Sequence, residues 1–92
     1  MLIVNQKIDF GDIVLPFDST IQFFNSDDTA ISFSLKPSCG CIYFEVPKFV
    51  LQSGETIDAK VSISIKSSSG VEKPVYVVSD DQVIETIVLK WH

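Results

Sequence analysis

Arginine is missing from this sequence, and its seven basic residues are lysines scattered singly along the 92-residue chain. Twelve acidic residues outnumber the lysines and give a net charge of -5. Nucleic acids and anionic lipids are bound through clusters of basic side chains that neutralise phosphate groups. We therefore expect neither a nucleic acid nor a membrane as the partner. An acidic balance suits a soluble protein, or one that complements a basic protein surface.

Long apolar runs are missing as well. The run at residues 1–4 stops at Asn5, has no basic flank and lacks a small-residue cleavage site, so it does not have the features of a signal peptide. No stretch has the length of apolar residues that crosses a bilayer. We therefore expect a cytoplasmic chain, or one on the outside of a virion assembled there. Removal of an earlier signal would make the periplasm or the cell surface the alternative.

Groups for catalysis and for cofactor binding are scarce. The single histidine is His92, and a catalytic Cys and His pair would need it to reach Cys41. The twelve serines include no Gly-x-Ser-x-Gly elbow, and the four glycines form no phosphate-binding loop. Acidic pairs at residues 27–28 and 80–81 would bind calcium only if their turns met, and neither belongs to a recognisable ligand loop. We expect no enzymatic activity, cofactor, metal or small-molecule substrate.

Apolar and polar residues alternate in several short segments, most clearly at residues 57–66, where every odd position is apolar. Such alternation predicts half-buried strands of an antiparallel sheet. Further strands are expected at residues 20–24, 31–36, 75–78 and 84–89, and turns at residues 11–12, 25–28, 52–55, 67–70 and 79–81. A chain of this length with 46% hydrophobic residues predicts one domain over residues 1–92. We expect an all-β, immunoglobulin-like antiparallel β-sandwich of about seven strands, with a small barrel as the alternative.

Four segments, read in order, carry a family resemblance: residues 8–13, residues 20–26, the Ser38-Cys39-Gly40-Cys41 segment, and residues 49–55. Together they resemble the Cys-Gly-Cys immunoglobulin-like domains of unknown function common in Bacteroidetes, which are similar to the ASPM, Hydin and major-sperm-protein-like β-sandwiches. The chain departs from that pattern where Asn25 begins a turn that usually has a glycine, and where Ser53 replaces a proline. The resemblance implies a non-catalytic binding or assembly module. Members of that family are usually exported, so a chain without a visible export signal suggests a relative carried by a phage.

The two cysteines, Cys39 and Cys41, allow three interpretations. A disulfide is awkward if the segment is extended, because same-face neighbours on a strand lie near or beyond the Cα separation that a bridge tolerates, so Gly40 would have to bend the chain. A metal site needs three or four ligands, and the remaining soft candidate is the distant His92. We therefore expect reduced thiols packed in the structure, and keep Cys39 and Cys41 as candidate redox residues.

A contact surface is predicted where the chain has more apolar residues than one inward face can bury. Residues 42–49 place apolar side chains on both faces of a strand, and both ends of the chain are apolar. The candidate partner contacts are Tyr43, Phe44, Phe49, Leu2 and Trp91. Burial within the sandwich is the competing interpretation for the aromatic residues, and completion of a sheet edge is the competing interpretation for the two apolar ends.

The sequence therefore favours a non-catalytic structural or interaction protein. Its most specific form is an accessory subunit, for decoration or assembly, of a phage particle or a similar large protein assembly, with a capsid or other structural protein as the partner. The alternative is a binding module of the cell envelope whose Cys-Gly-Cys segment is active in redox chemistry or metal binding. An enzyme is the least favoured class because the sequence assembles no catalytic constellation.

Overall fold

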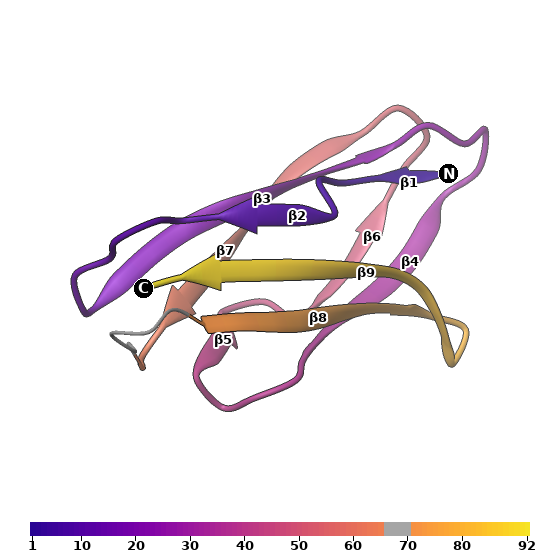
Figure 1. Cartoon of the computed structure of the whole chain (residues 1–92). Coiled ribbons are helices and arrows are strands. Elements are labelled where there is room, and N and C mark those ends of the chain that lie inside the picture. The colour runs from indigo at the N-terminus through magenta and orange to yellow at the C-terminus, as the bar shows by residue number, and fades with distance from the viewer. Residues whose placement is uncertain (66–70) are drawn as a thin grey trace.

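The computed structural model describes residues 1–65 and 71–92, which form two β-sheets packed face to face (Figure 1). One sheet has the strand order β1-β3-β7-β5, comprising β1 (Leu2–Ile3), β3 (Phe17–Asn25), β7 (Thr56–Ile63) and β5 (Ile42–Phe44). The other has the order β2-β9-β8-β4-β6, comprising β2 (Lys7–Asp9), β9 (Gln82–Trp91), β8 (Val71–Ser79), β4 (Ile31–Pro37) and β6 (Lys48–Leu51). The predicted all-β, immunoglobulin-like sandwich is confirmed. Within the described ranges, no helix has the length and apolar character to cross a membrane.

The strands predicted from alternation coincide with long strands of the structure. Residues 20–24, 31–36, 75–78 and 84–89 fall within β3, β4, β8 and β9, and the pattern at residues 57–66 corresponds to β7 as far as Ile63. The described residues form nine strands instead of about seven, because β1, β2 and β5 are only two or three residues long. Alternation cannot be recognised over so few positions. The turn predicted at residues 67–70 lies outside the described residues.

The core lies between the two sheets and is built from the alternate residues that point inward. In β7, Ala59, Val61 and Ile63 are almost fully buried, whereas Asp58 and Lys60 on the opposite face of the strand are exposed. Facing strands contribute the same pattern from the other sheet, with the buried residues Leu35, Val75, Val77, Ile87, Leu89 and Trp91. Burying these side chains is the main stabilising term of such a small domain.

Two turns require backbone conformations that the sequence signals correctly. Gly54 has a φ of 75° in the turn between β6 and β7, where the Glu55 amide donates to the Gln52 carbonyl at 3.0 Å. Glycine suits this position because it has no Cβ to clash in the left-handed region. Asp80 and Asp81, with φ values of 51° and 60°, form the two-residue turn of the β8–β9 hairpin, where aspartate is tolerated because its short polar side chain can bond to the local backbone.

The chain leaves the five-stranded sheet after Pro37, beside Pro74 of the neighbouring strand β8. Pro37 ends β4, and the next amide, that of Ser38, donates to the Pro74 carbonyl of β8 at 3.1 Å. A residue's N and carbonyl point to the same side of an antiparallel strand, so the missing N–H of Pro74 lies on the side where β4 has ended. The chain therefore crosses after Pro37 to the four-stranded sheet, and the crossing segment contains Cys39, Gly40 and Cys41.

One pair of strands is parallel, which the expectation of a purely antiparallel sandwich did not include. β1 pairs with the end of β3 in the four-stranded sheet. After β1 the chain crosses to the other sheet, where β2 runs parallel to β9 and pairs with its residues 88–90. The amide of Val88 donates to the Gln6 carbonyl at 2.8 Å, and the His92 amide to the Gly11 carbonyl at 2.9 Å. Three residues of β2 carry no pattern that reports the direction of their partner.

Candidate functional site

The Cys39–Cys41 segment is a closed turn in the structure, and the two sulfurs form a disulfide. The Cα atoms lie 5.3 Å apart, inside the range that a bridge accepts. This corrects the expectation of reduced thiols. That expectation assumed an extended strand, whereas the segment bends at Gly40 and the Ile42 amide donates to the Cys39 carbonyl at 3.4 Å.

Neighbouring strands hold this turn from both sheets. On one side the Ser38 amide bonds to Pro74 of β8, as described above. On the other side the Ser64 amide donates to the Cys41 carbonyl at 3.0 Å, and the Ser64 hydroxyl approaches the same oxygen at 3.4 Å. The bend therefore depends on contacts with residues far away in the sequence.

A cleft of about 580 Å³ lies beside the disulfide at this end of the sandwich. The cleft is lined by the disulfide turn, by the residue Ile65 after β7, by the start of β8 and by the end of β9. The lining residues are Cys39, Gly40, Cys41, Ile65, Val71, Glu72, Lys73 and Trp91. Ile65 is 57% exposed although it continues the apolar positions of β7, because the strand ends at Ile63. Trp91 is buried, and its Nε1 donates to the Ile65 carbonyl at 2.8 Å.

Three of the five predicted partner contacts lie in the core instead of on the surface. Leu2 is 7% exposed, Phe44 is 4% exposed and Trp91 is fully buried. Both apolar ends complete a sheet, since β1 pairs with β3 and the last residues of β9 pair with β8. The side chains of Leu2 and Trp91 are therefore covered by the facing sheet, and Phe44 is buried as the competing interpretation held.

The other two predicted contacts, Tyr43 and Phe49, lie on consecutive edge strands. Tyr43 in β5 is 62% exposed, and Phe49 in β6 is half-buried, with its ring stacked on that of Phe33 at 5.5 Å. In the described part of the chain, β5 is an edge of one sheet and β6 an edge of the other. Two further apolar residues are also exposed, Val46 at 53% within residues 42–49 and Val50 at 60% directly after them; neither was predicted as a contact.

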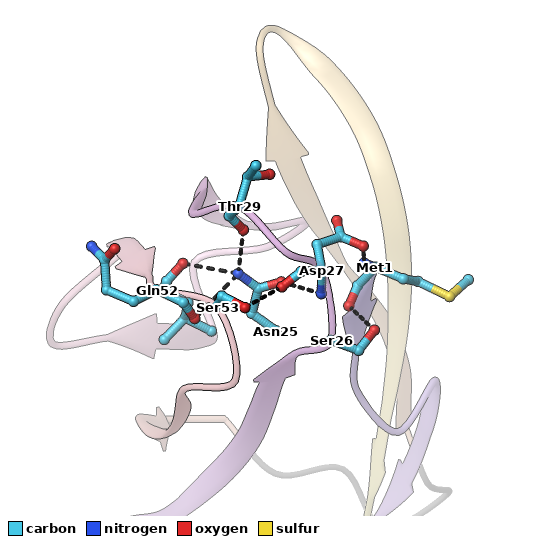
Figure 2. Close-up of polar contacts among 8 residues, drawn as sticks. Met1, Asn25, Ser26, Asp27, Thr29, Gln52 and Ser53 are labelled. Carbon is cyan, nitrogen blue, oxygen red and sulfur yellow. Dashed lines mark hydrogen bonds and ion pairs between the residues drawn. The ribbon is translucent and has the colours of Figure 1, made fainter.

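A buried asparagine organises the opposite end of the sandwich (Figure 2). Asn25 is fully buried, and its Nδ2 lies 2.9 Å from the Thr29 carbonyl, 3.0 Å from that of Leu51 and 3.3 Å from that of Gln52. Its Oδ1 accepts the Asp27 amide at 2.9 Å. Asn25 thereby joins the turn after β3 to the turn after β6. Sequence reasoning treated it only as a turn residue, although an asparagine directly after an alternating strand was a usable signal.

The remaining residues considered for catalysis or metal binding, His92 and the two acidic pairs, do not form a common site in the described structure. His92 Nε2 lies 2.8 Å from Asp12 Oδ1, so its partner is a carboxylate and not Cys41. Asp27 forms an ion pair with the amino group of Met1, while Asp80 and Asp81 occupy the β8–β9 turn. In residues 1–65 and 71–92, no three His, Cys, Asp or Glu side chains are grouped so that they could hold a metal ion.

The profile of a protein family of unknown function, DUF1573, matches residues 1–91. The chain belongs to the DUF1573 family. This confirms the predicted membership of a family of unknown function, with the Cys-Gly-Cys motif present at residues 39–41. A comparison with curated proteins found no match.

Solved structures resemble this DUF1573 domain in fold. A protein of unknown function from Porphyromonas gingivalis W83 superposes with a TM-score of 0.80 at 10% identity, over 99% of this chain and 46% of its own. The E. coli chaperone DraB superposes with a TM-score of 0.76 at 10% identity, and the match covers 100% of this chain and 54% of the DraB chain. The MSP-domain-like protein SSP-19 of Caenorhabditis elegans superposes with a TM-score of 0.63 at 13% identity, and the match covers 88% of this chain and 89% of SSP-19. The domain thus spans about half the length of the first two proteins.

Proposed function

We propose that this DUF1573 domain is a non-catalytic protein-binding domain that uses the exposed stretch of β5, the following loop and β6 to contact its partner. The observation that carries the proposal is the exposure of three large apolar side chains along residues 43–50: Tyr43 on the edge strand β5, Val46 in the following loop and Val50 on the edge strand β6. Exposed large apolar side chains often mark protein contacts, and aromatic anchors supply much of the binding energy. The fold resemblance to the chaperone DraB supports this role, because a chaperone acts by binding other proteins.

The surroundings of this stretch fit an interface of ordinary composition. Glu45 and Lys48 are exposed on either side of Val46, so apolar contacts are flanked by charges of both signs. A shallow groove of about 210 Å³ runs between the loop and β7, with Val46, Phe49 and Ala59 among its lining residues. An apolar centre with a charged rim is the usual anatomy of a reversible protein interface.

Two settings are proposed for this binding role. The first is an accessory subunit of a phage particle or a similar assembly, with a capsid or other structural protein as partner. The second is a binding module of the cell envelope, in the periplasm or at the cell surface. The Cys39–Cys41 disulfide favours the second setting, since disulfides persist in oxidising compartments and are rare in a reducing cytoplasm. Detection of the chain at a fixed ratio to the capsid protein in purified particles would support the first setting.

Site-specific photo-crosslinking in the cells that produce the protein tests the binding role. A benzophenone amino acid replaces Tyr43 or Val50 in turn, and Lys7 in the edge strand β2 is replaced as a matched exposed control. We expect the first two positions to give a discrete adduct with the same protein, and the Lys7 position to give none. Equal adducts from all three positions, or none from Tyr43 and Val50, would reject this surface.

A further inference from the structure

We propose that the Cys39–Cys41 disulfide is a site of thiol–disulfide exchange, at which a cysteine thiol of a peptide or protein segment entering the adjacent cleft forms a mixed disulfide with Cys39. The substrate class is a pair of cysteine thiols on one polypeptide, next to apolar residues. This inference goes beyond the binding role proposed above and does not depend on the β5–β6 surface.

The two sulfurs differ in access, which sets the point of attack. Cys39 is half-buried, whereas Cys41 is only 5% exposed and belongs to the core cluster. Exchange proceeds when a thiolate approaches one sulfur of a disulfide and displaces the other. An incoming thiolate therefore reaches Cys39, and Cys41 is the residue released.

The exchange balances without any further reactant. The first substrate thiolate attacks Cys39 Sγ, a sulfur–sulfur bond forms between substrate and Cys39, and Cys41 leaves as a thiolate that takes up a proton. The second substrate thiolate then attacks the substrate sulfur of that mixed disulfide, and Cys39 leaves as a thiolate. The substrate loses two electrons and becomes a disulfide, while Cys39 and Cys41 gain them and become thiols.

Backbone geometry stabilises the group that leaves in the second step. The Cys41 amide donates to Cys39 Sγ at 3.3 Å, and an N–H directed at a sulfur favours its thiolate form. Lys73, half-buried in the same cleft, adds positive charge to the site. The neighbouring Glu72 lies 3.9 Å from Lys90, which offsets part of its negative charge.

The position of the turn keeps both cysteines in place when the bridge is open. Ser38 is tied to β8 and Ser64 to the Cys41 carbonyl, and these bonds involve neither sulfur. The reduced thiols therefore stay close together, so the same site can run in reverse, with Cys39 attacking an external disulfide and Cys41 resolving it. A cleft of about 580 Å³, with Ile65 exposed at it, has room for the side chains that flank a substrate cysteine.

The first test compares the reactivity of each thiol alone. In Cys41→Ala, Cys39 should react with 5,5′-dithiobis(2-nitrobenzoate) on the order of tenfold faster than Cys41 does in Cys39→Ala, because Cys39 is the more accessible of the two in the folded chain. In concentrated guanidinium chloride the two rates should be equal. Equal rates in the two folded variants, or faster reaction of Cys41, would overturn the assignment of Cys39.

The second test uses the unaltered chain, so it does not depend on the folding of a variant. Oxidised protein is mixed with a synthetic peptide that carries two cysteines flanked by leucines, and the reaction is trapped with N-ethylmaleimide and mapped by mass spectrometry. We expect peptide joined to Cys39 and maleimide on Cys41, followed by oxidised peptide and reduced protein. The opposite placement, or exchange seen only after the protein is unfolded, would overturn the proposal.

The role of the cleft is tested with Ile65→Ser, whose side chain is exposed and outside any strand. This variant should slow exchange with the leucine-flanked peptide several-fold, because apolar contact with the substrate is lost, and should leave exchange with reduced glutathione unchanged. Equal slowing with both thiols, or none with either, would reject the cleft as the substrate-binding surface.

Discussion

The indole Nε1 of Trp91 donates a 2.8 Å hydrogen bond to the backbone carbonyl of Ile65, and this bond links the two sheets near the end of the chain. Trp91 belongs to β9 of the five-stranded sheet, whereas Ile65 follows β7 of the four-stranded sheet. The same pair lies at the cleft beside the disulfide. Trp91 thus contributes to the stability of the sandwich and to the shape of its candidate exchange site.

Trp91→Phe tests this link. The substitution keeps an aromatic ring in the core but removes the donor and leaves the Ile65 carbonyl without it, so we expect a loss of about 1–3 kcal/mol in the free energy of unfolding. Urea denaturation measures the loss. Tyr76→Phe, which removes a hydroxyl from a 38% exposed side chain, is the control and should change stability little. Equal stability of Trp91→Phe and the unaltered chain would show that the bond contributes nothing.

Asn25→Asp places a negative charge where three carbonyl oxygens now face an amide nitrogen. Aspartate has nearly the same shape but cannot donate when ionised, and Asn25 is fully buried. We expect destabilisation of about 3 kcal/mol or more at neutral pH. The matched control is Gln22→Glu, which makes the same chemical change at an exposed position of β3. A similar thermal shift in both variants would argue against a structural role for the Asn25 amide.

Val61→Asp tests the inward face of β7. Val61 is 1% exposed, so an aspartate there would be buried without a partner, and we expect a loss of several kcal/mol, about half or more of the stability of so small a domain. Thr20→Asp is the control, because Thr20 is exposed and lies opposite Lys60 in the register, which favours an acidic residue. Circular dichroism during heating should show early unfolding of the first variant only.

Replacement of both Cys39 and Cys41 by serine should leave the fold intact. The bridge closes a very short loop, so its entropic contribution is small, and with two polar atoms near the core the total cost is about 1–3 kcal/mol. Urea denaturation should place the midpoint of the reduced parent chain between those of the oxidised parent and the variant, because reduction opens the bridge without adding hydroxyl groups near the core. An unfolded variant would instead make the disulfide essential to the domain.

Tyr43→Ala should weaken partner binding by about 1 kcal/mol or more, roughly a fivefold rise in Kd, because an exposed aromatic anchor is removed. Stability should change little, since Tyr43 is 62% exposed on an edge strand. Titration calorimetry with the partner identified by crosslinking measures the affinity, and Lys7→Ala is the control. A large loss of stability with unchanged affinity would move the interface elsewhere.

Local patterns in the sequence determined much of this fold. The alternation at residues 57–63 specified both a strand and its buried face, because side chains on a strand point alternately to its two sides. Gly54, Asp80 and Asp81 marked turns whose left-handed backbone few other residues adopt easily. The Cys-Gly-Cys segment, together with the surrounding motifs, pointed to the family that matches the whole domain.

Only the tertiary structure decided how the distant pieces meet. Leu2 and Trp91 are buried because their strands pair with neighbours in the sandwich, and this pairing cannot be derived from the residues next to them in the sequence. The disulfide closes because bonds from Ser38 to β8 and from Ser64 to Cys41 hold a bend between the two sheets. Such contacts join residues far apart along the chain, so their geometry is set by the packing of the sheets and not by the neighbouring sequence.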